Sequence, residues 1–361
     1  MKILHVINDL SAAGAQKVVF DLSLGAKRLG HEVDVIVLES CSSHFETELK
    51  GKGVNVISLN NKHHIYNPLN IFKILKLMSG YDIVHSHLFP TQYWVSIAKR
   101  LKKKLPIIIT TEHNTTNKRR KSKFWNLIDK FIYKKYDKII PCSEEAGKAF
   151  GKCFPTIDYE VIPNGVDISS IKSAPLSTKT ELFGLDENTT CICMVARLQY
   201  PKRQDILIEA ISKLPDNYHA IIVGEGINKE KLENLANELG IKDRVHFMGV
   251  RADIATIIKT CDINCLITEY EGLSISSIEC MAAGRPFIAS NAPGLRDMAD
   301  GAGVIVNNDS NELASAIHDL KVNKAEAVAE RCSTRAQKYD ILKTVEDYVT
   351  IYQSCIESAR C

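Results

Sequence analysis

The clearest fold signature in the chain is the stretch Ile263–Pro286, with the sequence I-N-C-L-I-T-E-Y-E-G-L-S-I-S-S-I-E-C-M-A-A-G-R-P. Its first five residues form an apolar run of the kind found in a buried strand, and Gly272 then permits a tight turn. The serines that follow can cap a helix, and Gly284 and Pro286 would end it. The stretch therefore predicts a strand, a turn and a short helix.

The N-terminus of this predicted helix favours a negatively charged ligand. Free backbone N–H groups and a partial positive charge at such a position suit a pyrophosphate. Glu271 lies just before the helix and Glu279 within it, and carboxylates accept hydrogen bonds from sugar or ribose hydroxyls. A capped surface helix with two solvated glutamates has the same spacing, and it is the commoner explanation of such a pair taken alone.

Outward from this stretch, short apolar runs alternate with segments of helical period along the whole chain. This pattern is typical of parallel strands joined by crossover helices. The expected strands are Lys2–Ile7, Glu32–Leu38, Asn55–Leu59, Ile83–His87, Ile107–Thr111, Lys138–Pro141, Tyr159–Ile162, Thr190–Val195, His219–Val223, Val245–Met248, Ile263–Ile267, Phe287–Ala289 and Gly303–Val306. We therefore expect an α/β protein with two Rossmann-like, doubly wound parallel sheets.

The length of 361 residues suits two domains, and the loop-like segment Pro163–Lys179 is the expected link between them. The predicted domains are residues 1–165 and 166–340, with a last helix at about 341–361 that packs back on the first domain. Ligands of such sheets bind beyond the carboxyl ends of the strands, so a site is expected in a cleft between the two domains.

Two cations follow the expected strand Thr190–Val195. Arg197 stands at its end, and Lys202 lies near the start of the next helix. Two fixed cations would stabilise the charge on a departing nucleotide diphosphate without a metal. An arginine followed five residues later by a lysine is also common on protein surfaces, so this spacing alone indicates little.

Two small-residue turns also follow expected strands. In the first, D-L-S-A-A-G-A-Q, Gly14 lets the backbone approach a ligand, and the second is G-E-G at Gly224–Gly226. Neither has the G-x-G-x-x-G spacing of dinucleotide-binding proteins. A nicotinamide enzyme is therefore poorly supported.

Three histidines, His85, His87 and His113, lie near strand ends in the sequences H-S-H and T-T-E-H-N. An H-x-H pair can ligate zinc. No Asp or further His stands nearby to complete a familiar hydrolytic metal site, and D-x-D is absent. We therefore expect structural or hydrogen-bonding histidines and no catalytic metal.

The composition is that of an ordinary globular protein, with 45% apolar and 25% charged residues and no apolar run of the length that a membrane span needs. The opening M-K-I-L-H-V-I-N-D-L lacks the long apolar core of a signal peptide. Eleven scattered cysteines without C-x-x-C pairs are typical of a reducing compartment. A cytoplasmic protein is expected.

The net charge of +3 conceals an asymmetry, because residues 1–166 carry +10 and the remainder −7. Much of the excess lies in Lys99–Lys104 and in Lys118–Lys138, where bases alternate with aromatic and aliphatic residues. Such a stretch fits an anionic membrane surface, which for a cytoplasmic protein would be the inner face of the membrane. A solvated basic face on a helix whose apolar stripe is core explains it equally well, and nucleic acid is disfavoured because no nucleic-acid-binding module accompanies the charge.

Taken together and in this order, these segments resemble the retaining glycosyltransferases of family 4 (glycosyl transferases group 1), which have the GT-B fold of two Rossmann-like domains. The resemblance covers nearly the whole chain. It lies in the small-residue turn at Ala13–Gly14, T-E-H-N, V-I-P-N-G-V-D, Arg197 with Lys202, I-V-G-E-G, V-H-F-M-G, and Glu271-x7-Glu279 followed by M-A-A-G-R-P.

The resemblance implies roles for the matching positions. Glu271 would hold the donor sugar and Glu279 the ribose, while Arg197 and Lys202 would bind the pyrophosphate. His113 would be the active-site histidine near the reacting carbon. The remaining donor contacts would come from Gly14, Gly272, Leu273 and Ser274, and from Gly224, Gly226, Val250 and Arg251 beside the base. Front-face attack without an enzyme nucleophile would retain the configuration, with a nucleotide diphosphate sugar, UDP favoured, as the co-substrate and no other cofactor.

Several positions depart from the family's usual pattern: Ala13 and Ser274 stand where glycine is frequent, and P-G-L-R-D at Pro293–Asp297 replaces a common G-G-x-x-E. These departures leave the identity of the sugar open. The basic first half suits a lipid-diphosphate or glycan acceptor in surface polysaccharide assembly. Two alternatives are a GT-B-fold sugar-nucleotide epimerase and a non-catalytic protein that binds through its basic face.

Overall fold

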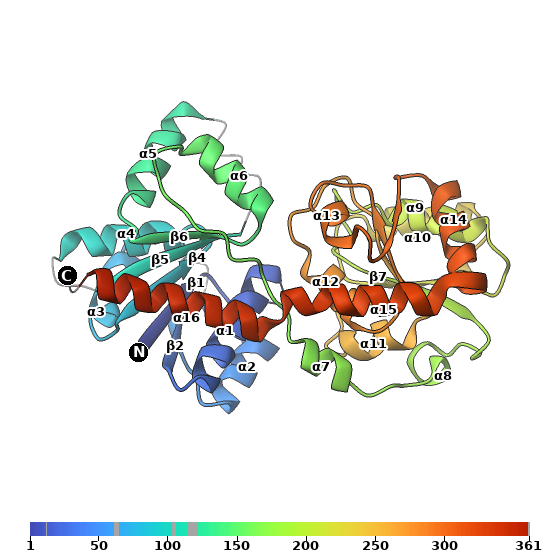
Figure 1. Cartoon of the computed structure of the whole chain (residues 1–361), viewed down its shortest axis with the longest axis horizontal. Helices are drawn as coiled ribbons and strands as arrows, with labels where there is room; N and C mark the ends of the chain where they lie inside the picture. Colours follow the sequence, from blue (N-terminus) through green and yellow to red (C-terminus); the bar gives the residue numbers. More distant parts are fainter. Residues whose placement is uncertain (12, 61–64, 103–105, 114–121, 360–361) are drawn as a thin grey trace. The chain divides into compact units, whose positions relative to one another are not determined.

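The computed structural model describes residues 1–361 except 12, 61–64, 103–105, 114–121 and 360–361. The chain forms two compact units, which are coloured by sequence in Figure 1. Unit 1 comprises Met1–Gly165 together with Ile341–Cys361, and unit 2 comprises Val166–Asp340. Each unit has its own parallel sheet and its own core.

Unit 1 is built on a six-stranded parallel sheet with the strand order β3-β2-β1-β4-β5-β6. Its central strands are rich in Val and Ile and are buried on both faces, as crossover helices require, whereas the edge strand β3 is partly exposed. Its elements are β1 (Lys2–Ile7), α1 (Gly14–Arg28), β2 (Glu32–Glu39), α2 (His44–Gly51), β3 (Asn55–Asn60), α3 (Asn70–Met78), β4 (Ile83–His87), α4 (Thr91–Leu101), β5 (Ile107–Glu112), α5 (Lys123–Tyr133), β6 (Lys138–Pro141), α6 (Glu144–Cys153) and α16 (Ile341–Ser358).

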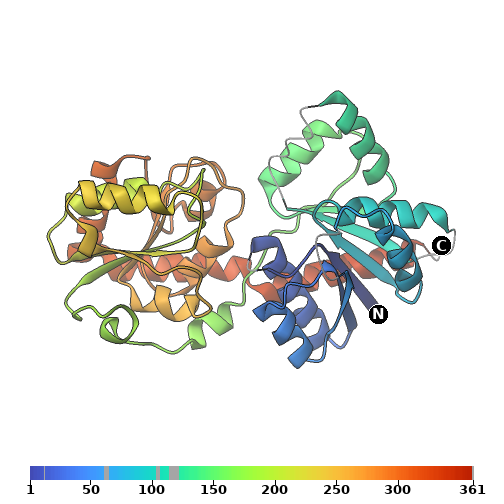
Figure 2. The same ribbon diagram turned by 180° about the vertical axis from the view of Figure 1, so that it is seen from behind.

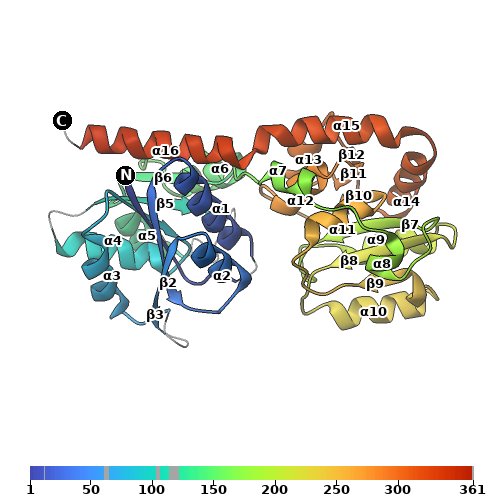
Figure 3. The same cartoon turned by 90° about the horizontal axis from the view of Figure 1, so that it is seen from below.

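Helix α16 returns to unit 1 and packs beside α1, as Figures 1 and 3 show. Gly25 on α1 allows this close approach, because a Cβ there would lie 2.4 Å from Val345 Cγ2. Two buried tyrosines of α16 extend to the sheet: the Tyr352 hydroxyl lies 2.7 Å from His85 Nδ1, and the Tyr348 hydroxyl lies 3.0 Å from the hydroxyl of Thr111. The last helix therefore covers the strands that carry the histidines.

Unit 2 repeats the same topology in a second six-stranded parallel sheet, with the order β12-β11-β10-β7-β8-β9. Helices α9 and α10 lie side by side on one side of this sheet, which Figure 2 shows from behind. Its elements are α7 (Ile168–Ser173), α8 (Lys179–Phe183), β7 (Thr190–Val195), α9 (Gln204–Ser212), β8 (Tyr218–Val223), α10 (Lys229–Glu238), η2 (Lys242–Arg244), β9 (Val245–Phe247), α11 (Ile254–Thr260), β10 (Ile263–Leu266), α12 (Ile275–Ala282), β11 (Phe287–Ser290), α13 (Leu295–Ala299), β12 (Val304–Val306), α14 (Ser310–Asp319), η3 (Leu320–Lys324), α15 (Ala325–Ala336) and η4 (Gln337–Tyr339).

The predicted fold class is confirmed, and twelve of the thirteen expected strands are present to within one residue at either end. The prediction of a strand at Tyr159–Ile162 is wrong. This segment follows β6 through two backbone hydrogen bonds, from Glu160 N to Ile139 O and from Ile162 N to Pro141 O, but it forms no strand. Its alternating apolar residues pack against α6 instead, where Tyr159 and Val161 lie over Gly147.

Candidate active site

The residues predicted to bind the donor in unit 2 all lie at or beyond the carboxyl edge of its sheet or on the helix that follows. This edge is where open α/β sheets bind their ligands. Arg197 and Lys202 follow β7, Gly224 and Gly226 follow β8, Val250 and Arg251 follow β9, Glu271, Gly272, Leu273 and Ser274 follow β10, and Glu279 lies on α12.

Lys202 and Glu271, 69 residues apart in the sequence, form an ion pair in which Lys202 Nζ donates to Glu271 Oε2. Their side chains are only 16% and 21% exposed. Burial, followed by the positive charge of Arg197, lowers the pKa of Lys202 to about 8. Arg197 itself is exposed, and its charge acts on Lys202, so two cations lie near each other at this edge. This group of charges can exchange internal pairing for contacts with an anionic ligand.

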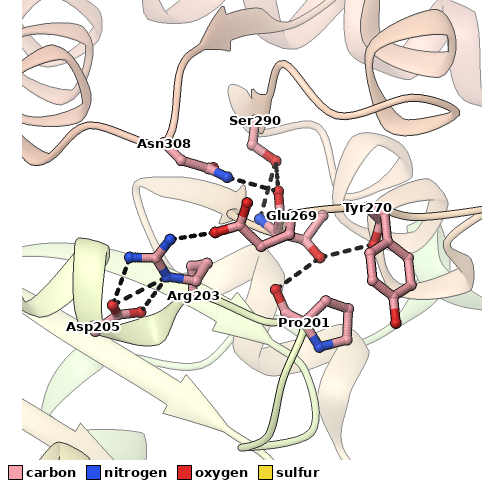
Figure 4. A network of polar contacts seen from close by, with 8 residues as sticks. Pro201, Arg203, Asp205, Glu269, Tyr270, Ser290 and Asn308 are labelled. Carbon is pink, nitrogen blue, oxygen red and sulfur yellow. Dashed lines mark hydrogen bonds and ion pairs between the residues drawn. The ribbon is translucent and has the colours of Figure 1, made fainter.

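An arginine not singled out from the sequence ties together the two loops that carry this pair. Arg203 donates to both carboxylate oxygens of Asp205 at 2.8–3.1 Å and to Glu269, as Figure 4 shows. Its backbone N–H also donates to Ile267 O at 3.0 Å. The only sequence signal for this role is its position next to Lys202. Arg203 thus helps to hold the strand end before Glu271 in place.

Thr268 anchors the same loop from the other side. Ser290 Oγ accepts from the Thr268 N–H and donates to the Thr268 carbonyl oxygen, both at 3.0 Å. Asn308 Nδ2 donates to that carbonyl oxygen at 3.1 Å, and Thr268 Oγ1 donates to Pro201 O at 3.3 Å (Figure 4). The backbone three residues before Glu271 is therefore bonded on several sides.

The predicted turn and helix cap after β10 are confirmed. Ser274 is the N-cap of α12, its hydroxyl accepting from the Ser277 N–H at 3.3 Å, and Leu273 is partly buried against the core. Gly294, from the P-G-L-R-D segment, has a φ of 77°, and a Cβ there would lie 2.5 Å from Gly272 O and 2.6 Å from Glu271 O. The loop that differs from the family pattern therefore packs directly on the turn that carries Glu271.

The G-E-G segment packs against the loop that carries Arg197. Gly224 has a φ of 134°, and a Cβ on it would lie 2.2 Å from Ala196 O, while one on Gly226 would lie 2.4 Å from Leu198 O. Backbone packing therefore requires glycine at both positions. Both also lie close to the carboxyl edge of the sheet. Val250, which is exposed, and Arg251, which is partly buried, lie nearby, and the Arg251 guanidinium bonds Asp253 at 2.6–2.7 Å.

In unit 1, Gly14 and His113 also lie beyond the carboxyl ends of strands. Gly14 is the first residue of α1, and a Cβ there would meet nothing within 4 Å. His113 follows β5 and is partly exposed, with Nε2 3.1 Å from His87 Nδ1. Burial lowers the pKa of His113 to about 4, so its imidazole is neutral at pH 7.

The structure adds His5 to the histidines found in the sequence. It lies on β1 in register with His85, and its Nδ1 is 3.1 Å from His87 Nε2. Ring nitrogens of His5, His85 and His87 fall within 4.8 Å of one another, close enough to hold a metal ion. However, His85 already bonds the hydroxyls of Tyr352 and Thr111, and both nitrogens of His87 face other imidazoles. These contacts fit a hydrogen-bonded cluster better than a set of metal ligands.

The basic aromatic stretch of unit 1 is partly described. Within α5, Ile132 and Tyr133 are buried, but Phe124, Leu127 and Phe131 are 66%, 70% and 56% exposed. The predicted basic stretches are Lys99–Lys104 and Lys118–Lys138. Of these, Lys103, Lys104 and Lys118–Lys121 lie outside the described residues. In the described part of the chain, no helix is long and apolar enough to cross a membrane. The alternative of a basic helix whose apolar stripe is core therefore fits Ile132 and Tyr133 but not Phe124, Leu127 and Phe131.

Two family models together match most of the chain. Residues 12–170 match the model of Glycosyltransferase Family 4, and residues 178–339 match Glycosyl transferases group 1. Among curated proteins, the chain is 28% identical over 308 residues to the Escherichia coli UDP-Gal:alpha-D-GlcNAc-diphosphoundecaprenol alpha-1,3-galactosyltransferase, covering 79% of this chain and 78% of that one. It is 24% identical over 310 residues to the E. coli O-antigen biosynthesis glycosyltransferase WclY, covering 83% of each.

Solved structures agree on the fold. The Anabaena protein HepE, crystallised with UDP and glucose, superposes with a TM-score of 0.86 at 22% identity, covering 98% of this chain and 100% of that one. The topology and the family matches both indicate a glycosyltransferase of two Rossmann-like domains. This chain belongs to the family 4 glycosyltransferases, the glycosyl transferases group 1, and is a retaining glycosyltransferase with the GT-B fold that uses a nucleotide sugar.

Proposed function

We propose that this enzyme transfers a sugar from a UDP-sugar to a lipid-diphosphate-linked or glycan acceptor in the assembly of a surface polysaccharide. The observation that carries the proposal is the Lys202–Glu271 pair at the carboxyl edge of unit 2, held by the Arg203 and Thr268 networks. The E. coli relative named above acts on a UDP-sugar and a diphosphoundecaprenol-linked acceptor, and this likeness supports both choices.

In the proposed mechanism, the diphosphate of the donor binds Lys202 and Arg197, and Lys202 leaves Glu271 to do so. Glu271 is then free to accept hydrogen bonds from hydroxyls of the transferred sugar, and Glu279 from those of the ribose. The two cations stabilise the negative charge that develops on the leaving diphosphate. The acceptor attacks from the face the diphosphate leaves, and a phosphate oxygen takes its proton, so the configuration is retained.

The roles in unit 1 are part of the same proposal. His113 contacts the donor sugar near the reacting carbon, and the open space at Gly14 lets the backbone approach the diphosphate. Gly272, Leu273 and Ser274 contribute backbone contacts at the N-terminus of α12, where free N–H groups favour phosphate. Gly224, Gly226, Val250 and Arg251 lie beside the base.

Release of UDP tests this function. The enzyme is incubated with a panel of UDP-sugars and a polyprenyl-diphosphate-linked sugar, with and without EDTA, and the product is examined by NMR. We expect UDP release only with acceptor, unchanged by EDTA, and a product with the anomeric configuration of the donor. A new sugar nucleotide formed without acceptor would indicate an epimerase instead, and the absence of both UDP release and a new sugar nucleotide in the wild-type protein would indicate a non-catalytic protein.

A lipid-linked acceptor would lie at a membrane surface, and helix α5 of unit 1 is the proposed contact with that surface. Phe124, Leu127 and Phe131 are exposed along one side of α5, and Arg100 stacks 3.8 Å from the ring centroid of Phe131. Such an apolar face flanked by bases binds anionic lipid surfaces. We expect Leu127→Ser to weaken co-sedimentation with phosphatidylglycerol vesicles several-fold, whereas Phe72→Ser on α3, where Phe72 is 61% exposed, does not. Equal weakening by both would contradict a specific role for α5.

A further inference from the structure

Three imidazoles in unit 1 form a single hydrogen-bonded chain. His5 Nδ1 lies 3.1 Å from His87 Nε2, and His87 Nδ1 lies 3.1 Å from His113 Nε2. His5 and His87 are almost completely buried, while His113 is partly exposed. The chain therefore runs from the interior of the sheet to its carboxyl edge.

All three rings are neutral at physiological pH. Burial lowers the pKa of His5 to about 3 and that of His113 to about 4, and burial together with the neighbouring histidines lowers the pKa of His87 well below its usual value. A neutral imidazole has one N–H donor and one acceptor nitrogen. Each ring that donates through one nitrogen must accept at the other, so both hydrogen bonds run in the same direction along the chain.

The buried end of the chain decides this direction. His5 Nε2 is buried without a hydrogen-bond partner among the described residues. If His113 donated to His87 and His87 to His5, this nitrogen would carry a buried N–H with no acceptor. In the opposite direction it carries no proton. Buried donors without an acceptor are rarer in proteins than buried acceptors without a donor, so the second direction is favoured. The other end, at partly exposed His113, can satisfy either role with solvent.

We propose that His5 and His87 are positioning residues that hold His113 in the tautomer with its proton on Nδ1, so that His113 meets its ligand as a hydrogen-bond donor to an oxygen atom. Because His87 donates to Nε2, this nitrogen has no lone pair left to act as a base. The contact with the donor sugar itself rests on the proposed function. The tautomer does not, since it follows from the three rings alone.

His85 provides a matched control within the same cluster. It lies on β4 two residues before His87, and it is equally buried. Its nitrogens face the hydroxyls of Tyr352 at 2.7 Å and Thr111 at 2.8 Å, so it is outside the chain of imidazoles. A substitution there disturbs the core to a similar extent without removing the donor to His113.

NMR of the full-length protein labelled with 15N-histidine tests the tautomer directly. Long-range 1H–15N correlations distinguish a protonated from an unprotonated ring nitrogen, and His113→Gln identifies the signals of His113. We expect protonated Nδ1 and unprotonated Nε2 in the wild-type protein. The reverse pattern would overturn the proposal, whether or not the enzyme transfers sugar.

Variants then test the positioning role. In His87→Leu we expect the signals of His113 to lose the fixed Nδ1–H pattern, whereas His87→Asn, whose amide nitrogen can replace Nδ1 as the donor, and His85→Leu keep it. If His87→Leu does not fold, His5→Leu takes its place. If His113 keeps the fixed Nδ1–H pattern in folded His87→Leu or His5→Leu, the other two imidazoles do not hold its tautomer, and the positioning role is overturned.

Turnover separates this inference from the proposed function. Loss of a fixed donor to the sugar predicts a fall in kcat of about 10- to 100-fold in His87→Leu and partial rescue in His87→Asn, with little change in His85→Leu. A tautomer that responds as expected without any effect on turnover would leave the positioning of His113 standing and remove its contact with the donor.

Discussion

The two sheets have the same strand order, but their carboxyl edges differ in chemistry. Unit 1 places neutral, buried imidazoles next to its edge, with the pKa of each histidine in the cluster lowered by burial. Unit 2 places an ion pair there, between Lys202 and Glu271, with exposed Arg197 close by. The two sheets have carboxyl edges of the same backbone topology, so the side chains at each edge determine whether it can bind a charged group.

The difference follows from the cost of burying charge. A buried charge without a partner is strongly unfavourable, so a protein either neutralises it or pairs it. The imidazoles of unit 1 are neutral, whereas the charges of unit 2 are paired and remain partly accessible to water. Binding of a diphosphate can therefore replace one anionic partner of Lys202 by another. In the proposed mechanism, unit 2 therefore binds the charged part of the donor, and unit 1 contacts its hydroxyl groups.

The largest expected effect comes from removing one member of the charged pair. We expect Lys202→Ala and Glu271→Gln each to lower kcat by about 100- to 1,000-fold, the range found when a single charge-stabilising group is removed. The melting temperature should change far less than the turnover, because the partner left behind keeps some contact with water. Steady-state kinetics and thermal unfolding measure the two effects.

Asp216→Asn is the control for this pair, because Asp216 is fully exposed and bonds Arg244 at 3.3 Å away from the edge. Its turnover should equal that of the wild-type enzyme. Wild-type turnover in Lys202→Ala and Glu271→Gln as well would contradict the assignment of the site to this edge.

A smaller effect is expected from Gly294→Ala. Its Cβ would meet the carbonyl oxygens of Gly272 and Glu271 and displace the turn that carries Glu271. Gly301→Ala is the matched control, since Gly301 has a similar φ of 70° but only Arg335 Nη2 near its Cβ position, at 3.9 Å. Both variants should lose about 1 kcal/mol of stability through backbone strain, and Gly294→Ala should lose more because of its contacts with these carbonyl oxygens.

Only Gly294→Ala should also lower kcat/KM, by about 10- to 100-fold, because only its Cβ reaches the loop of Glu271. Assays of both variants at a temperature where each is folded distinguish the two effects. Equal losses of activity would show that the P-G-L-R-D loop acts on stability alone.

The smallest expected effect is a change with pH. The pKa of Lys202 is about 8 in the free enzyme, and a diphosphate binds the protonated form. Affinity for UDP should therefore be constant below pH 8 and fall up to about tenfold per unit above it. Lys202→Arg should flatten this profile, since arginine stays protonated throughout the range. Calorimetric titration between pH 7 and 9.5 measures it, and an unchanged slope in Lys202→Arg would assign the effect to another group.

The sequence predicted the sheets well, because runs of Val and Ile between helical segments are set by burial on both faces. It also placed Lys202 near the start of the helix after one strand and Glu271 just before the helix after another. Their pairing could not be predicted, since it depends on how β7 and β10, neighbours in the sheet but distant in sequence, bring their loops together. His5 was missed for the same reason: it meets His85 and His87 only through the pairing of β1 with β4.

The error at Tyr159–Ile162 has the opposite cause. Its alternating pattern is real, but it reflects packing of Tyr159 against α6 at the edge of the sheet, where no further strand pairs with it. Networks such as the one around Thr268 were also beyond prediction, because each bond joins a side chain to a backbone group of a distant loop. Local patterns are therefore informative about elements, and tertiary pairing determines the site.

The most direct test of the account is whether UDP binds through Lys202. Thermal unfolding is followed with and without UDP in the wild-type enzyme, in Lys202→Ala and in Lys213→Ala, which changes a lysine at the other end of α9 that bonds Ser310 at 2.7 Å. At 100 times its dissociation constant, UDP should stabilise the wild type and Lys213→Ala by about 2.7 kcal/mol, and Lys202→Ala should lose most of this gain. Equal stabilisation of all three proteins would contradict the central role of the Lys202–Glu271 edge.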